Sequence, residues 1–426
     1  MKKKAVALAV GALFAAPAVH AQITMGNETI GTVQIYGKLY PQFSSAKGNG
    51  STQIGDGVST LVSRTGIYTT ANATASGGAF NAAEGRIPDH GQRYAVDSQN
   101  TYIGFRGERN LGGRLKAIWQ VEQSVELDTG TGQWSNRNSF AGLSHGVFGT
   151  IKLGNMDTIY KEYGDTFGMF GISSGNFVSA SNVLSHIGIG SNNAARFHER
   201  RANSVQYQTA EFGGFQAGVQ YGPDEARGEP GTGLNRNLWS TGIKFDSQMF
   251  YGSLQYELHN DAFGATNNIA DSTITNTAAG ARSRDSAVRG SGEIRFAGQR
   301  IVVDVARLHY TESGQIGAGR FLEYKKPNWA VGYDANVGPW GFAAQYVRAG
   351  SGTCQLTGGV DCSTTGLASW MLSLGTRYRF DRQTFVYLIA NKLSNGPSAR
   401  HDNWAGSNPN RGEDLKQIAL GISYSF

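Results

Sequence analysis

The sequence predicts an all-β fold: a transmembrane antiparallel β-barrel of 16 strands, with short periplasmic turns and long extracellular loops. Three observations favour this fold. The chain begins with an export signal, and no later run of about 18 apolar residues follows that could span a bilayer as a helix. Segments of about ten residues also alternate apolar with polar side chains. An exported chain that is only 39% hydrophobic has the composition of an outer-membrane barrel.

Residues 1–21 have the features of a cleaved secretory signal peptide. Three lysines, Lys2 to Lys4, precede an apolar stretch from Ala5 to Val19, and the small-residue sequence Val19-His20-Ala21 follows. The alternative, a short N-terminal helix of the mature fold, does not explain the basic start and the cleavage pattern together. We therefore expect residues 22–426 to form the barrel.

The net charge gives no reason to expect a nucleic-acid partner. The 38 Lys and Arg residues exceed the 32 Asp and Glu residues by six, but three of the lysines belong to the signal. Residues 22–426 therefore carry a net charge of only +3. We also expect no cofactor and no metal, because the sequence contains no nucleotide-binding loop and no His-Glu-x-x-His motif.

The alternating segments predict the strands in chain order. The last segment shows the pattern best, since Ile418, Leu420, Ile422, Tyr424 and Phe426 share one face and polar or small residues occupy the other. The same test places strands at 32–43, 98–108, 113–125, 137–145, 148–155, 200–209, 214–221, 238–246, 249–259, 287–297, 299–311, 325–336, 339–349, 367–380, 382–393 and 415–426.

The connections between these segments alternate between tight and long. The tight ones contain Gly, Asp, Asn or Ser, which favour turns: 110–112, 146–147, 210–213, 247–248, 298, 337–338 and 381. The long ones are 44–97, 126–136, 156–199, 222–237, 260–286, 312–324, 350–366 and 394–414. Strict alternation is typical of bacterial barrels, whereas a soluble β-sandwich has no reason to produce it.

Charged residues gather on one face of most strands. Because a Lys or Arg facing lipid costs about 2–4 kcal/mol at the bilayer midplane, ten misplaced charges would cost roughly 20–40 kcal/mol. We therefore expect the charged face to line the lumen. The predicted basic wall is Lys38, Arg106, Lys116, Lys152, Arg200, Lys244, Arg289, Arg295, Arg377 and Arg379, and the acidic residues there are Glu122, Glu257, Glu293 and Asp334.

An interior with so many charges requires water or charge partners, and a barrel of this size leaves an aqueous channel. The sequence thus predicts a passive, water-filled channel for small hydrophilic solutes and ions. The basic excess favours a mild anion preference. The strand at 299–311 leaves one question open: Asp304 and Arg307 have opposite parity, so one of them must lie near a rim.

The two cysteines, Cys354 and Cys362, lie between two strand patterns. In the oxidising periplasm we expect them to form a disulfide rather than remain free thiols. Closing so short a loop contributes roughly 2.5 kcal/mol in the chain-entropy model. No further Cys or His lies near enough in sequence to suggest a zinc site.

Several segments resemble the general porins of β-proteobacteria and Neisseria. They include Gln34-Ile35-Tyr36-Gly37, the run from Gly104 to Gly113, the run from Leu115 to Gln120, Gly149-Thr150-Ile151-Lys152-Leu153-Gly154 and the terminal Tyr424-Ser425-Phe426. The resemblance implies a homotrimer in the Gram-negative outer membrane, surrounded by its lipid. It also implies that Phe426 is the signal read by the barrel assembly machinery.

The resemblance further implies that loop 156–199 folds inward as the pore constriction. Acidic residues on this loop, Asp157, Glu162 and Asp165, would then oppose Lys38, Arg106, Lys116 and Lys152 on the wall; Lys161 lies among the acids. The alternative for each acid is a solvated loop charge. The first loop, 44–97, is far longer than the family pattern, so it could narrow the mouth or contact a partner.

Three other functions are alternatives to a general channel: an enzyme, a solute-specific channel and an adhesin. The pattern Gly-x-Ser-x-Gly occurs at 142–146 and 171–175, but neither copy lies between a strand and a helix, so we do not expect an enzyme. A solute-specific outer-membrane channel and a surface adhesin built on a barrel remain alternatives. Liposome swelling graded by solute size separates the three, since only a general channel shows a smooth decline with mass.

Overall fold

A computed structural model describes residues 23–27, 31–62, 80–130, 135–172, 175–189, 197–225, 235–262, 281–403 and 409–426. The expected signal peptide, residues 1–21, lies outside the described residues, as do residues 63–79 of the first loop. Within the described ranges no helix is long and apolar enough to cross a bilayer.

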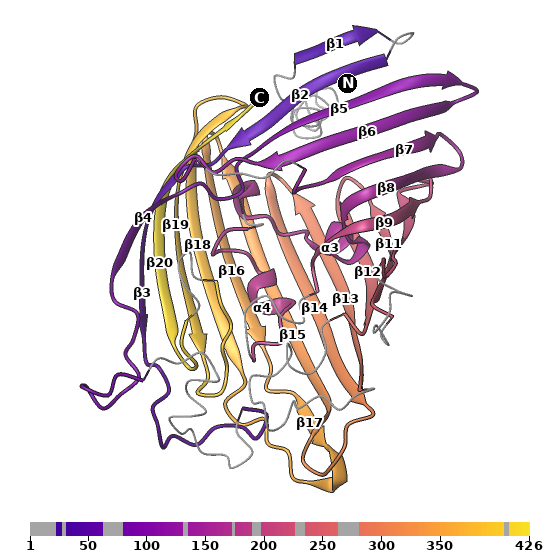
Figure 1. Cartoon of the computed structure of the whole chain (residues 1–426). Helices are drawn as coiled ribbons and strands as arrows, with labels where there is room; N and C mark the ends of the chain where they lie inside the picture. The colour runs from indigo at the N-terminus through magenta and orange to yellow at the C-terminus, as the bar shows by residue number, and fades with distance from the viewer. Residues whose placement is uncertain are drawn as a thin grey trace.

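Sixteen antiparallel strands close into a ring, which confirms the predicted fold (Figure 1). In ring order they are β2 (Gly31–Leu39), β5 (Tyr102–Gly112), β6 (Leu115–Ser124), β7 (Ser139–His145), β8 (Gly149–Asp157), β9 (Arg200–Gln208), β10 (Phe215–Gly222), β11 (Asn237–Asp246), β12 (Phe250–Asn260), β13 (Arg282–Phe296), β14 (Gln299–Ser313), β15 (Phe321–Val337), β16 (Trp340–Ala349), β18 (Ser369–Arg379), β19 (Thr384–Asn395) and β20 (Asp414–Ser425). Each overlaps one predicted segment. The ring closes where the end of β20 pairs with β2, Ser425 opposite Lys38.

Four further strands lie outside this ring: β1 (Ile23–Asn27), β3 (Gln42–Asn49), β4 (Arg93–Asp97) and β17 (Thr353–Leu356). β3 pairs with both β20 and β4, so these two strands extend the wall beyond β2 and β5. The break between β2 and β3 falls at Pro41, which has no N–H to donate to a ladder. The first loop therefore runs from 50 to 92 and is shorter than the predicted 44–97.

Exposure alternates along the strands as the sequence predicts. On β14, Ile301, Val303 and Val305 are 38–54% exposed, whereas Val302 and Asp304 between them are 1% and 2% exposed. The apolar row therefore faces outward and the other row faces the interior. This alternation also answers the open question on this strand: Asp304 points inward, and Arg307 is an exposed outward residue.

Short helices form in the third loop, where the sequence showed no helical pattern. They are α3 (Ile159–Gly164), the 3₁₀ turn η1 (Met169–Gly171) and α4 (Ser181–Leu184), and they lie within the ring of strands (Figure 1). A second 3₁₀ turn, η2 (Thr357–Gly359), follows β17. Thr158 caps α3, because its hydroxyl accepts a hydrogen bond from the Lys161 N–H.

The interior is partly filled by an apolar cluster. Residues of the first and third loops pack there against the inner wall and against residues near the last loop: Val58, Leu61, Val62, Ile87, Val183, Leu184, Ile187, Ile189, Phe197, Leu308, Tyr310, Tyr324, Leu367, Met371, Leu393 and Leu415. The charged inner face predicts an aqueous channel, and this cluster fills part of the interior. Loop side chains, which the strand pattern does not include, occupy part of the space.

The expected disulfide is confirmed. Cys354 on β17 is bonded to Cys362, with their Cα atoms 5.7 Å apart. Both cysteines pack against the apolar cluster. The bond therefore holds the loop between β16 and β18 against the interior side of the mouth.

Candidate functional site

The third loop, residues 158–199, is held against the inner wall by hydrogen bonds with two strands, β11 and β12. The N–H of Tyr160 donates to the Ser240 hydroxyl at 2.9 Å. The hydroxyls of Tyr251 and Ser253 donate to the Tyr163 carbonyl at 2.6 and 3.0 Å. These contacts place α3 inside the barrel, as the family resemblance implies for this loop.

Glycines on the wall receive aromatic side chains from the same loop. A Cβ atom added to Gly332 would lie 2.7 Å from the ring of Phe167, and one added to Gly375 would lie 2.7 Å from the ring of Phe170. A larger residue at either position would displace the loop. Sequence reasoning missed these two positions, although glycine inside an alternating strand was the signal that could have identified them.

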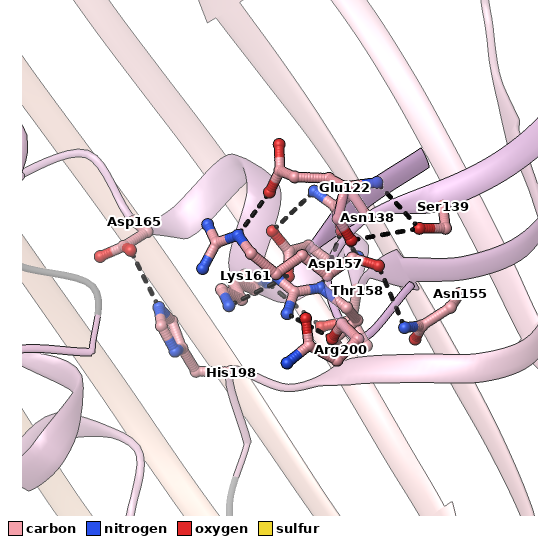
Figure 2. Close-up of polar contacts among 12 residues, drawn as sticks. Glu122, Asn138, Ser139, Asn155, Asp157, Thr158, Lys161, Asp165, His198 and Arg200 are labelled. Carbon is pink, nitrogen blue, oxygen red and sulfur yellow. Dashed lines mark hydrogen bonds and ion pairs between the residues drawn. The ribbon is translucent and has the colours of Figure 1, made fainter. Parts of the chain in front are cut away.

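The predicted loop charges neutralise one another at the start of the loop (Figure 2). The carboxylate of Asp157 lies 3.0 Å from the Lys161 ammonium and 2.9 Å from the Arg200 guanidinium. Asn138 also donates to this carboxylate at 3.1 Å. Arg200, predicted as part of the basic wall, is thus a partner of Asp157, which the structure places at the end of β8 and not in the loop.

The other two loop acids contact residues that the sequence did not single out. The carboxylate of Glu162 accepts a hydrogen bond from Gln208 at 2.7 Å. Asp165 lies 3.0 Å from the imidazole of His198 (Figure 2). Burial lowers the pKa of His198, although the nearby carboxylate opposes that shift.

The predicted basic wall makes no ion pair with these loop acids, apart from Arg200, within the described part of the chain. Lys38, Arg106, Lys152 and Lys244 instead lie 4.9–5.5 Å from the centres of aromatic rings, those of Tyr40, Tyr36, Phe140 and Tyr163. Lys116 lies 2.7 Å from Glu108, and both side chains are exposed. Of these cations, Lys244 contacts the third loop through the ring of Tyr163, and none of the five forms an ion pair with the loop acids within the described residues.

Two predicted lining residues face inward but do not reach open space. Arg289 is 1% exposed and pairs with Asp304 at 3.1 Å, and Glu257 is fully buried beside His259. Arg289 lies directly against Gly164 at the end of α3. Strand parity predicts that these two residues line the pore, but it takes no account of the third loop, which packs near them and covers them.

The remaining acidic wall residues belong to networks with arginines that the sequence analysis missed. Glu122 accepts hydrogen bonds from Arg137 at 2.5 Å and from Tyr36 at 3.0 Å. Glu293 lies 2.6 Å from Arg295 and 3.7 Å from Arg300. Arg137 falls in a predicted strand but was not assigned to the lumen, and Arg300 begins a strand whose parity was unresolved.

Two open cavities adjoin the third loop. On the side of the long loops, a cavity of about 490 Å³ is lined by Lys161, His186, His198 and Arg200 together with polar residues of β4 and the following segment. On the side of the tight turns, a cavity of about 1430 Å³ is lined by Phe170, Gly171, Arg295, Arg300, Asp334 and Arg377 among others. The loop thus borders a cavity toward each end of the barrel, and charged side chains line both.

The tip of the loop lies between two cations. The Arg377 guanidinium lies 5.1 Å from the ring of Phe170, and its described hydrogen-bond partner is Asn336, at 2.7 Å. On the other side, a Cβ atom added to Gly171 would lie 3.4 Å from the Lys38 ammonium. Arg379 is exposed at the end of the same strand as Arg377.

The first loop packs over part of the mouth. Thr52 donates to the Pro397 carbonyl at 2.7 Å, and the Ser59 N–H donates to the Ser398 hydroxyl at 2.8 Å. The His90 imidazole lies 2.7 Å from the Glu413 carboxylate, and this hydrogen bond raises the pKa of His90. The first loop therefore rests on the last loop at these three points.

The serine of the first Gly-x-Ser-x-Gly motif forms a hydrogen bond between two neighbouring strands. Ser144 lies on β7, and its hydroxyl shares a 2.9 Å hydrogen bond with Thr150 on the neighbouring strand. The motif leads into a turn and not a helix, unlike a nucleophile elbow. Residues 173–174 of the second motif lie outside the described residues.

Comparison with known sequences finds a family model described as Gram-negative porin, which matches residues 5–398. Curated relatives include the major outer membrane protein P.IB of Neisseria lactamica, 33% identical over 168 residues, or 38% of this chain and 44% of the relative. P.IB of Neisseria gonorrhoeae is 36% identical over 150 residues, or 35% of this chain and 38% of the relative. The aligned stretches span less than half of each relative.

Solved structures with the same fold cover nearly the whole chain. An anion-selective porin from Comamonas acidovorans superposes with a TM-score of 0.62 at 18% identity, covering 93% of this chain and all of that one. A trimer form of OmpT from Vibrio cholerae superposes with a TM-score of 0.56 at 14% identity, covering 93% and 99%. At these identities the likeness establishes the fold.

Proposed function

This chain belongs to the Gram-negative porin family and is an outer-membrane protein, and we propose that it forms a passive, water-filled channel for small hydrophilic solutes and ions. The position of the third loop supports this function most directly, because its residues border a cavity lined by charged side chains toward each end of the barrel. A diffusing solute would pass this loop. In a planar bilayer the refolded protein should conduct with an ohmic single-channel current; absence of conductance would remove the proposal.

The channel should prefer anions mildly. The cavity on the side of the tight turns is lined by three arginines, Arg295, Arg300 and Arg377, and by two acidic residues, Glu293 and Asp334. A basic lining favours anions. The Comamonas porin with the same fold is described as anion-selective. The reversal potential in a salt gradient measures the preference, and a cation-selective value contradicts it.

Within this function, loop residues Asp157, Lys161, Glu162 and Asp165 would set the local charge at the constriction. Asp157 is already compensated by Lys161 and Arg200, so its contribution to the field along the pore should be small. Lys38, Arg106, Lys116 and Lys152 would then act on passing ions from the wall. Replacing Asp157 by Asn should change ion selectivity less than replacing Lys38 by Gln.

A solute-specific channel is the second candidate, and the packing of the first loop favours it. Residues 51–62 and 80–90 lie on the last loop and contribute to the apolar cluster of the interior. Such a cover would narrow the entrance. Liposome swelling distinguishes the two functions, since a specific channel saturates with its solute while a general one declines smoothly with solute mass.

We further propose a homotrimer, and that Phe426 is the assembly signal. The trimer form of a Vibrio porin with the same fold is consistent with the first point. Phe426 exchanges two backbone hydrogen bonds with Gly37, of 2.9 and 3.0 Å, where the ring closes. Deleting Phe426 should lower the yield of heat-resistant folded protein in the outer membrane, and an unchanged yield would argue against the signal.

A further inference from the structure

The second half of the third loop is held by β15 and by the last loop, whereas its first half is held by β11 and β12. Asn328 on β15 donates a hydrogen bond to the Leu184 carbonyl at 2.9 Å. In the last loop, the Arg400 N–H donates to the Gly188 carbonyl at 2.8 Å. Residues of this half also belong to the apolar cluster that fills part of the interior. Release of these contacts would therefore loosen the cover of the mouth.

Two buried basic side chains meet where the loops join. The side-chain nitrogen of Lys326 on β15 donates to the Ile187 carbonyl at 2.9 Å and lies 2.7 Å from Nε2 of His401. Lys326 is 0% exposed and His401 is 1% exposed. The Nδ1 atom of His401 lies 3.4 Å from the Asn182 carbonyl. Because a carbonyl only accepts, Nδ1 carries the ring hydrogen and Nε2 accepts from Lys326, so this arrangement requires a neutral imidazole.

The backbone of the third loop passes directly against this imidazole. Gly188 has a φ of +71°, and a Cβ atom added to it would clash with Nε2 of His401. Glycine adopts this conformation readily and leaves room for the ring. A change in the charge of His401 therefore acts on the loop backbone and on Lys326 at the same time.

Protonation of His401 would bring two cations into contact in a buried position. Burial lowers the pKa of His401, and the neighbouring charges of Lys326 and His186 lower it further. Within the described ranges, neither Lys326 nor His401 forms an ion pair with a carboxylate. An uncompensated buried cation is strongly unfavourable. His186 borders the cavity of about 490 Å³ on the side of the long loops, so water has access to this region.

Three acids of the first and last loops act on a different imidazole. They are Asp89, Asp402 and Glu413, and each raises the pKa of His90. None of the three is among the described groups whose charge acts on His401. Protonation therefore has opposite effects at the two histidines: it strengthens the contact of His90 and weakens that of His401.

We propose that Lys326 and His401 form a pH-sensitive latch that closes the third loop onto the last loop and opens on acidification. Above about pH 7 the imidazole is neutral and the latch is closed. Because the pKa of His401 is lower in the closed state than in a released one, the released state binds the proton more readily. The closed state therefore loses stability as the pH falls below about 6.5. Opening frees residues 182–189 and widens the mouth, a last step that rests on the proposed channel function.

Hydrogen exchange measures the opening of the latch directly. In the refolded full-length protein, the intrinsic-rate-corrected exchange of a peptide spanning 180–189 should rise roughly tenfold between about pH 7.5 and about pH 5.5, since the released state binds one more proton with a pKa near 6.5. In H401Q the amide still accepts from Lys326 and donates to the Asn182 carbonyl but binds no proton, so the rise should disappear. The control H145Q, at the end of β7 beside a tight turn, should keep the full rise.

A comparison within the wild type decides the case if H401Q does not fold. A peptide spanning 84–92 should exchange more slowly as the pH falls, because the hydrogen bond to Glu413 raises the pKa of His90. The peptide 180–189 should exchange faster over the same range. A change of both peptides in the same direction would count against the latch.

Liposome swelling with a large neutral sugar links the opening to solute entry. The wild type should swell faster at the acidic pH than at the alkaline one, and H401Q should swell equally at both. Constant exchange of 180–189 in the wild type, a full rise in H401Q, or loss of the rise in H145Q would overturn the latch. Faster exchange with equal swelling would overturn the widening of the mouth. A protein that conducts at no pH contradicts the channel function instead, while the exchange measurement still decides on the latch.

Discussion

Arg377 and Arg289 were assigned to the lumen by the same parity argument, yet their surroundings differ. Arg289 is buried and paired with Asp304. The negative charge of Asp304 therefore cancels most of the electric field that Arg289 would exert on an ion in the pore. Arg377 borders the periplasmic cavity beside the loop tip and contacts an amide and two aromatic rings. An inward charge therefore acts on the pore only where no opposite charge pairs with it and its side chain borders open space.

Replacing Arg377 by Gln should reduce the anion preference. A unit charge about 8 Å from the ion path contributes roughly 0.5 kcal/mol in water, with opposite sign for an anion and a cation, and salt screening at that distance lowers each contribution to about 0.2 kcal/mol. The anion-to-cation permeability ratio should therefore fall about twofold. The measurement is the reversal potential in a salt gradient. R382Q, at an exposed turn, removes the same charge and should leave the ratio unchanged; an equal effect of both variants would assign the selectivity to net charge alone.

Attachment of the first loop should weaken as the pH rises. The hydrogen bond to Glu413 raises the pKa of His90 above its usual value near 6.5. A raised folded-state pKa stabilises the folded arrangement fully below the unfolded pKa, and this contribution is lost as the pH rises through the folded pKa. Intrinsic-rate-corrected hydrogen exchange of a peptide spanning 84–92 should therefore accelerate over that window. In H90Q the corrected exchange should no longer depend on pH there.

At the scale of elements, α3 and η1 are positioned by the wall and not by their own helical tendency. α3 has only six residues and η1 three, too few for an isolated helix to be stable in water. Hydrogen bonds from β11 and β12 and the space above wall glycines hold the loop in place. The sequence signal for this docking was the pair of glycines within the strands, Gly332 and Gly375, and not any pattern in the loop.

Replacing Gly332 by Ala should displace the loop tip. The added Cβ atom would lie 2.7 Å from the Phe167 ring, and overpacking of this kind costs about 1–3 kcal/mol. We expect single-channel conductance to change, with more frequent transitions between levels. Gly252, where an added Cβ atom meets nothing within 4 Å, supplies the control G252A. Identical traces for G332A and the wild type would mean that Phe167 relaxes without moving the loop.

At the scale of the whole molecule, segments far apart in sequence meet at the mouth. The first loop packs against the last one through Thr52, Ser59 and His90, and its apolar residues join those of the third loop. The disulfide between Cys354 and Cys362 holds a further loop against the same cluster. Four loops together therefore cover part of the mouth.

Replacing Leu61 by Asp should detach the first loop from this cluster. Leu61 is fully buried there, and an unpaired carboxylate in an apolar environment is strongly unfavourable. Liposome swelling should then become faster for larger solutes. The exposed Asp56→Asn change in the same loop is the control. Unchanged swelling in L61D would show that the first loop does not limit entry.

The strand positions, the ring of sixteen and the outward apolar rows could be derived from the sequence, because alternation with period two and the cost of charge in hydrocarbon act residue by residue. The disulfide followed from compartment and spacing. Only the tertiary structure decided which inward charges are open, since cover by the third loop depends on contacts such as that between Tyr160 and Ser240. It alone also placed Arg307 in the outward row, because the sequence pattern of that strand left open which of Asp304 and Arg307 faces the interior.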